Sequence, residues 1–168
     1  MANRAETLEQ VVLEVDRREA ERLIFREAVC TDENRYEEWL SLWTSECLYW
    51  VPSNSDDVDP RTHVNIIYDN RVAMEARVAR LKTGAAWAQD PPSKMRRVIG
   101  NFEIEADGED LVVWSNFILT ELRRSKQDTF AGRTLHIMRR EEGQLRIAMK
   151  KVLLVNNDEV IDNLTFII

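Results

Sequence analysis

Cysteine and histidine are scarce in this chain, with two residues of each among 168. Cys30 and Cys47 do not form a CxxC pair, so the sequence favours neither a disulfide framework nor a thiolate metal site. Reducing conditions also disfavour a disulfide between two such thiols. Both cysteines are therefore expected to be small buried side chains.

Long apolar runs are also absent. None approaches the roughly 20 residues of a membrane span, and the opening MANRAETLEQVV lacks the apolar core of a signal peptide. Basic residues are in deficit, with 23 Lys and Arg against 30 Asp and Glu. Such a surface is unsuited to neutralising phosphates. We expect a cytoplasmic location and neither a membrane nor a nucleic-acid partner.

The content of 44% hydrophobic residues in 168 supports one core and leaves too little length for two ordinary domains. We expect a single domain over residues 1–168.

Helical periodicity dominates the start of the chain. Residues 5–30 have apolar positions at helical spacing among many charges, and a break near residues 15–17 is left open. Thr31-Asp32 is expected to cap a second helix that carries Tyr36, Trp39, Leu40 and Trp43 on one face. A third helix is expected from Asp69 or Asn70, as the cap, to Thr83-Gly84.

Strand patterns fill most of the rest. A short strand is predicted over residues 47–51, a polar loop over 53–62, and long alternating strands over 95–105, 111–124, 129–140 and 144–155. Tight turns such as Asp107-Gly108 would join the long strands into an antiparallel meander. The sequence predicts an α+β domain whose curved, mixed and mostly antiparallel sheet wraps around the N-terminal helices to form a cone.

Side-chain alternation predicts the faces of two strands. Val98, Phe102 and Ile104 are expected on one face, opposite Arg97, Glu103 and Glu105, and the apolar positions of the next strand are the even ones from Val112 to Leu122. The ending LTFII should be paired or covered, because an exposed apolar edge invites aggregation, and a subunit contact could cover it.

Several segments together resemble a known family. They are EAERLIFREA at 19–28 followed by Tyr36-Glu37-Glu38-Trp39, LYWVP at 48–52, IIYDNR at 66–71, ARVARLKTGAAWAQDPPS at 76–93, RRVIGN at 96–101 and the NLTFII ending. In order and spacing they resemble the small (beta) subunit of bacterial aromatic-ring-hydroxylating dioxygenases. The resemblance covers residues 17–168 and implies the cystatin-like cone that is shared with nuclear transport factor 2 and the scytalone dehydratases.

The resemblance also implies partners. It implies a hexamer of three large (alpha) and three small subunits (α3β3), in which the small subunits form a trimer and have a structural role. The Rieske [2Fe-2S] cluster and the mononuclear Fe(II) would belong to the large subunit. That complex would dihydroxylate an arene with O2 and with electrons from NADH, delivered by a reductase and often a ferredoxin.

The chain's own Cys and His residues do not have the spacing that those cofactors require. A Rieske site needs closely spaced Cys-x-His pairs, and Cys30, Cys47, His63 and His136 show no such spacing. A non-haem iron site needs two histidines and a carboxylate, for which only His63, His136 and Asp69 come into question, without a ligand motif around them. No cofactor is therefore expected in this chain.

A second reading, a stand-alone dehydratase or isomerase of the same fold, remains open. Its catalytic residues would be Asp69, His136 and Tyr49, with Tyr68 as a further candidate and Trp50 or Trp114 as a pocket wall. Each also has a structural interpretation, since Asp69 can cap a helix, His136 lies within a strand and the tyrosines suit a core or an interface.

A cluster of arginines and a rigid loop point to a protein interface. The candidates are Arg71, Arg77, Arg80, Trp87, Pro91, Pro92, Arg96 and Arg97. Guanidinium groups form forked bonds to carboxylates, and a rigid aromatic loop is a typical anchor. The alternative is a solvated helix face with pairs such as Arg71 and Glu75. We expect the cluster to contact the large subunit and neighbouring small subunits.

Overall fold

The computed structural model describes residues 2–56, 59–83, 89–159, 161 and 164–168, with side chains from residue 16 onward. Its elements are, in chain order, α1 (Ala2–Asp32), α2 (Tyr36–Ser41), β1 (Trp43–Pro52), β2 (Asn65–Asn70), α3 (Arg71–Lys82), β3 (Lys94–Asp107), β4 (Asp110–Arg123), β5 (Lys126–Glu141) and β6 (Gln144–Leu154). None of the described helices is apolar over enough length to cross a bilayer.

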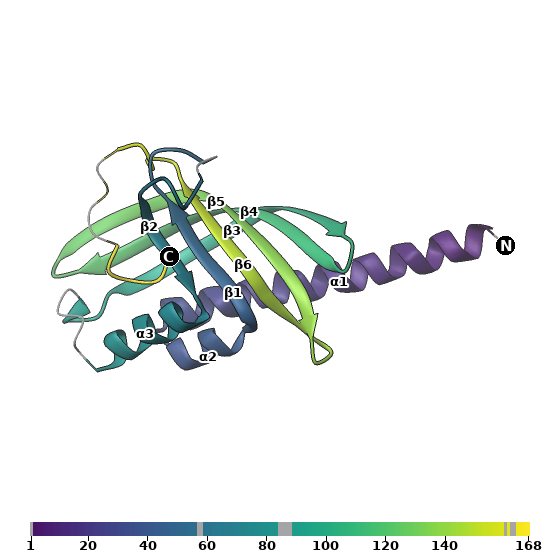
Figure 1. Ribbon diagram of the computed structural model, residues 1–168, viewed down its shortest axis with the longest axis horizontal. Helices are drawn as coiled ribbons and strands as arrows, with labels where there is room; N and C mark the ends of the chain where they lie inside the picture. Colours follow the sequence, from purple (N-terminus) through teal and green to yellow (C-terminus); the bar gives the residue numbers. More distant parts are fainter. Residues whose placement is uncertain (1, 57–58, 84–88, 160, 162–163) are drawn as a thin grey trace.

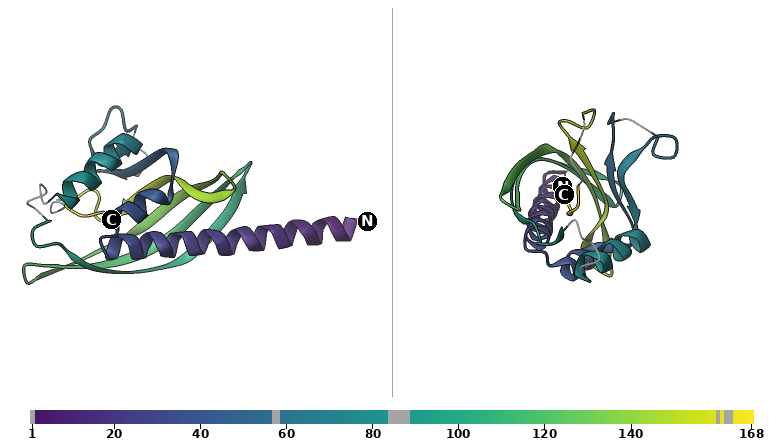
Figure 2. Two further views of the ribbon diagram at one scale, coloured as in Figure 1. Left: turned by 90° about the horizontal axis from the view of Figure 1, so that it is seen from below. Right: turned by 90° about the vertical axis from the view of Figure 1, so that its left-hand side faces the viewer.

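The six strands form one sheet in the order β2-β1-β6-β5-β4-β3. Neighbouring strands are antiparallel except β1 and β6, which are parallel. The sheet curves around α1, and α2 and α3 lie together at one side (Figures 1 and 2). The predicted α+β cone with a mixed, mostly antiparallel sheet is confirmed.

The long strands follow one another because tight turns join them. Gly108 and Gly143 have φ of 63° and 78°, a conformation that glycine adopts without steric cost, and each lies in a turn between two strands. The predicted meander from β3 to β6 is therefore present. The parallel pairing of β1 with β6 was not predicted from sequence.

In the helical part, the structure excludes the break that was left open and corrects the predicted bounds of the second helix. Helix α1 is continuous through residues 15–17, because Ala2–Asp32 contains neither proline nor glycine to break it. Thr31 belongs to α1, where its hydroxyl donates to the carbonyls of Glu27 and Ala28, so it does not cap a second helix. Helix α2 begins only at Tyr36, and Trp43 opens β1.

Helix α3 begins after one of its two predicted N-cap residues. The side chain of Asn70 accepts a hydrogen bond from the amide of Ala73 at 3.0 Å, which identifies Asn70 and not Asp69 as the N-cap. Met74 and Val78 on this helix are buried against the sheet.

The predicted faces of two strands are also wrong in part. A bulge in β3 between Gly100 and Glu103 reverses the alternation, so Arg97 faces the interior and Val98 is 74% exposed. In β4 the odd positions, including Val113, Phe117 and Leu119, are the buried ones. Apolar residues occupy both faces of β4, so alternation alone could not identify the inner one.

The core is aromatic at its centre. Trp39, Trp43 and Tyr49 make edge-to-face contacts, with ring centroids 5.3 to 6.1 Å apart. The 164–168 segment completes this core, with Leu164, Phe166, Ile167 and Ile168 buried. The chain itself thus covers its apolar ending. The sequence had predicted that this ending would be paired or covered.

Candidate functional site

A cluster of three ionisable side chains lies inside the cone. Glu27 on α1 accepts hydrogen bonds from Lys150 Nζ at 2.8 Å and from Trp39 Nε1 at 3.2 Å, and its second carboxylate oxygen lies 3.3 Å from His136 Nε2. His136 and Lys150 are register partners on β5 and β6, so the sheet presents both side chains to the helix. All three side chains are nearly excluded from solvent.

Charge compensation decides the protonation of this cluster. Burial by itself raises the pKa of Glu27, but the Lys150 ammonium and the hydrogen bonds from His136 and Lys150 bring it well below its ordinary value. Burial lowers the pKa of His136 and of Lys150, and Glu27 opposes both effects. The cluster therefore holds a Glu27 carboxylate and a Lys150 ammonium beside a neutral His136.

Tyr49 fixes the 164–168 segment within the cone. Its hydroxyl donates to the carbonyl of Ile168 at 2.9 Å and accepts from the Ile168 amide at 3.1 Å, while Lys150 Nζ donates to the same carbonyl at 3.0 Å. Burial raises the pKa of Tyr49, so its hydroxyl stays protonated. A tyrosine engaged on both sides in this way serves packing.

The space left beside the cluster is small. A cavity of about 10 Å³ is lined by charged, neutral polar and apolar side chains, namely Glu27, Arg97, Ile99, Ser115, Phe117, Thr134, His136, Lys150 and Ile168. The ring nitrogen His136 Nδ1 is buried and has no hydrogen-bond partner among the described residues. A neutral imidazole that donates through Nε2 leaves Nδ1 as an acceptor. The cavity has room for about one water molecule and for no organic substrate.

The catalytic set expected for a stand-alone enzyme is not assembled. Asp69, on β2, is bound to Arg77, with its carboxylate 2.6 Å from Arg77 Nε, and it takes no part in the cluster. The partner of His136 is Glu27, which sequence reasoning missed. The available signal was its spacing, because Glu27 follows Ala20 and Ile24 on the buried face of α1, where a carboxylate needs a partner.

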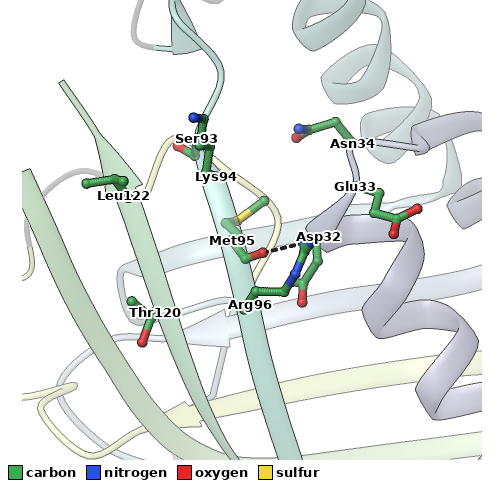
Figure 3. Close-up of a pocket in the computed structure, with 9 residues that line it drawn as sticks. All are labelled: Asp32, Glu33, Asn34, Ser93, Lys94, Met95, Arg96, Thr120 and Leu122. Atoms are coloured by element: carbon green, nitrogen blue, oxygen red, sulfur yellow. Dashed lines mark hydrogen bonds between the residues drawn. The ribbon is translucent and has the colours of Figure 1, made fainter. Parts of the chain in front are cut away.

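An open groove of about 680 Å³ lies on the surface between the end of α1 and the start of β3 (Figure 3). Asp32, at the end of α1, accepts from the Arg97 amide at 3.0 Å and from Arg97 Nε at 2.7 Å. Lys94 and Arg96 line the groove from β3, and Thr120 and Leu122 line it from β4.

The predicted interface residues divide into two groups. Arg97 is only 4% exposed in its pair with Asp32, and Arg77 is bound to Asp69, so both stabilise the chain internally. Arg71 bonds Glu75 at 2.7 Å and the carbonyl of Leu40 at 2.9 Å. The side chains of Arg80, Pro91, Pro92 and Arg96 are exposed. Trp87 lies outside the described residues.

The residues that could bind metal are dispersed. Cys30 is buried, Cys47 lies beside Met74, His63 is in the exposed loop before β2, and His136 is inside the cone. Within the described part of the chain, no group of three or more His, Cys, Asp or Glu side chains could hold a metal ion. These residues do not fit a Rieske cluster or a mononuclear iron.

Comparison with known proteins gives a consistent result. The family model described as "Ring hydroxylating beta subunit" matches residues 26–162. The small oxygenase component of the p-cumate 2,3-dioxygenase system of Pseudomonas putida is 34% identical over 143 residues, which are 83% of this chain and 79% of that protein.

Two solved structures have a fold similar to that of this chain. The beta subunit of benzoate 1,2-dioxygenase from Burkholderia mallei is 27% identical, with a TM-score of 0.72 over 88% of this chain and 95% of that one. An NTF2-like protein with a cystatin-like fold from Novosphingobium aromaticivorans is 16% identical, with a TM-score of 0.65 over 90% of each chain, and shows the fold alone. The chain belongs to the family of small (beta) subunits of ring-hydroxylating dioxygenases.

Proposed function

We propose that this chain is the structural, non-catalytic small subunit of a Rieske non-haem iron dioxygenase. The large subunit holds the [2Fe-2S] cluster and the mononuclear Fe(II), and three subunits of each kind form an α3β3 hexamer. A reductase, often with a ferredoxin, brings electrons from NADH. The cytoplasmic location expected from the sequence is part of this proposal.

The filled interior is the observation that carries the non-catalytic role. The cone contains acid and base groups in Glu27, His136 and Lys150, but the 164–168 segment leaves about 10 Å³ beside them. A general base must come within hydrogen-bond reach of the proton that it abstracts. An organic substrate cannot do so here while Ile168 occupies the cone.

The substrate class of the complex follows from the relatives. Their names give p-cumate and benzoate as substrates, both of which are carboxylic acids on a benzene ring. We infer that the complex formed by this chain dihydroxylates an aromatic carboxylate. The large subunit would select the ring, because the interior cavity that the described residues line, about 10 Å³, is too small for one.

Contacts with the large subunit are assigned to the exposed members of the predicted interface. Arg80, Pro91, Pro92 and Arg96 are accessible to a partner, and Trp87 belongs to the same stretch of sequence. Arginine forms bidentate bonds to carboxylates, and adjacent prolines hold a loop in one conformation. Arg77 and Arg97 are left out because they are bound within the chain.

Co-expression with the large subunit tests the proposal. We expect an assembly that contains both chains by native mass spectrometry, benzoate-type dihydroxylation by that assembly, and no turnover by the small subunit alone. Trp87→Ala should weaken the assembly, while Val64→Ala, an exposed change before β2, should leave it intact. Dehydration or isomerisation of a small molecule by the purified small subunit would support the rival enzyme reading instead.

A further inference from the structure

Residues 164–168 are held inside the cone by side chains and not by a strand ladder. They belong to no helix or strand, and no backbone–backbone hydrogen bond joins them to the other described residues. Instead, Tyr49 and Lys150 bind the backbone of Ile168, and Arg97 Nη2 donates to the carbonyl of Ile167 at 3.3 Å. In Figure 2 the labelled C-terminus lies within the curve of the sheet. The segment is thus held in the way that a protein holds a bound peptide.

The side chains around Ile168 include polar groups that a packed core does not need. Glu27, His136 and Lys150 line the cavity beside Ile168, and none of them is more than 4% exposed. A buried ion pair gives a fold little net stability compared with apolar residues of the same volume. His136 Nδ1 is in addition a buried acceptor without a partner among the described residues. These groups point to a site that binds a polar ligand.

The hydrogen bonds to Ile168 indicate the chemistry of that ligand. Tyr49 Oη and Lys150 Nζ both donate to one carbonyl oxygen, and Tyr49 Oη also accepts from an amide N–H. Neutral His136 offers Nδ1 as a further acceptor for an N–H group. The branched side chain of Ile168 fills the remaining space and is only 1% exposed. An aliphatic primary amide combines a carbonyl, two N–H donors and a branched alkyl group.

The charges around this site favour a neutral ligand over an anion. Lys150 is paired with Glu27 at 2.8 Å, and Arg97 is paired with Asp32 at 2.7 Å. Each buried cation therefore already has its own carboxylate. A carboxylate ligand would add a negative charge without a counter-charge, which is costly in a site excluded from water.

We propose that the interior of the cone is a binding site for small aliphatic amides, which Ile168 fills as an intramolecular ligand. An added amide competes with Ile168 for Tyr49 and Lys150. The affinity of the wild-type chain is therefore reduced by the small fraction of molecules in which the segment has left the cone. This site is additional to the proposed structural role and does not depend on the large subunit.

A variant that lacks Ile168 tests the proposal by isothermal titration calorimetry. The probe is 3-methylpentanamide, which has the side chain, the Cα and the carbonyl of Ile168. Its dissociation constant should be at least about tenfold lower for this variant than for the wild-type chain. The carboxylate 3-methylpentanoate has the same carbon skeleton and should bind at least about tenfold more weakly than the amide.

Two further variants show whether the amide occupies the expected place. Tyr49→Phe, in the chain that lacks Ile168, keeps the ring but removes one donor to the carbonyl, and should weaken amide binding about tenfold. Leu164→Ala in the full chain is the matched control, because Leu164 is buried in the same segment but does not line the cavity. It should not bind the amide more tightly than the wild-type chain. Circular dichroism verifies the fold of each variant.

Hydrogen exchange of the wild-type chain tests the opening of the site without any substitution. Since side chains hold the segment, the Ile168 amide should exchange by local opening, at least about tenfold faster than the amides of β5 and β6. Added 3-methylpentanamide should raise this exchange further, because it occupies the open form. This measurement decides the question if the chain that lacks Ile168 does not fold.

The contrary results are specific. A folded variant without Ile168 that does not bind the amide, or that binds the carboxylate equally well, would overturn the proposal. Exchange of the Ile168 amide only together with β5 and β6, or exchange that the amide does not change, would overturn it as well. None of these results bears on assembly with the large subunit, so the proposed function is tested separately.

Discussion

Lys150 Nζ lies 2.8 Å from the carboxylate of Glu27, across 123 positions of sequence and inside the cone. Neither side chain is more than 4% exposed. The pair joins α1 to β6, and Lys150 also binds the carbonyl of Ile168. One ion pair thus connects the first helix, the last strand and the end of the chain.

Removing one charge of this pair should destabilise the fold strongly. Glu27→Gln leaves the Lys150 ammonium buried without a counter-charge, and we expect the free energy of unfolding to fall by about 3–5 kcal/mol. Urea unfolding measures this loss. Glu75→Gln, in the exposed pair with Arg71, is the control and should cost only tenths of a kcal/mol.

Replacing both charges should cost less than replacing one. In Glu27→Met/Lys150→Met no charge remains buried, so the double variant should be more stable than either single variant. Strictly additive losses would show that Glu27 and Lys150 are not coupled.

Stability should depend on pH through His136. Because burial lowers its pKa in the folded chain, the unfolded chain binds a proton at higher pH than the folded chain does. The free energy of unfolding should therefore fall as pH drops below about 6.5, by at most about 1.4 kcal/mol per pH unit. Glu27 acts in a separate, more acidic window, because its pKa is lowered from 4.5.

Substitution isolates the histidine contribution. His136→Gln keeps a donor for Glu27 and should remove this slope between pH 5 and 6.5, as measured by urea unfolding at each pH. His63→Gln, in the exposed loop, should keep the wild-type slope. An unchanged slope in His136→Gln would refute the assignment of a neutral buried imidazole.

Gly132 is the glycine that the packing of the sheet requires. A Cβ there would overlap the carbonyl of Leu153 and touch Phe117, whereas a Cβ at Gly100 meets nothing within 4 Å. Gly132→Ala should lower the free energy of unfolding by about 1–3 kcal/mol. Gly100→Ala should leave it unchanged or raise it by up to about 1 kcal/mol, through the entropy of the unfolded chain. Equal effects would contradict the close approach of β5 and β6.

The Asn70 cap should be measurable in the same way. Asn70→Ala removes the acceptor for the Ala73 amide and should cost about 1 kcal/mol. Asn70→Asp retains an acceptor and should recover most of that loss, and a similar loss in both variants would argue against capping.

The sequence alone determined the class of fold and the order of its elements. Periodicity, helix caps and tight turns depend on residues a few positions apart, which is why α3 and the β3–β6 meander could be predicted. It also carried the family resemblance, because the segments keep their order along the chain.

Only the tertiary structure determined which side chains of each strand face the interior and which distant residues are in contact. The bulge after Gly100 moves Arg97 inward and Val98 outward, a reversal that alternation cannot indicate. The parallel pairing of β1 with β6 and the grouping of Glu27, His136, Lys150 and Ile168 join distant positions, and chain periodicity contains no information about such contacts. Whether the cone holds a pocket was settled by the 164–168 segment, whose apolar side chains are buried inside it.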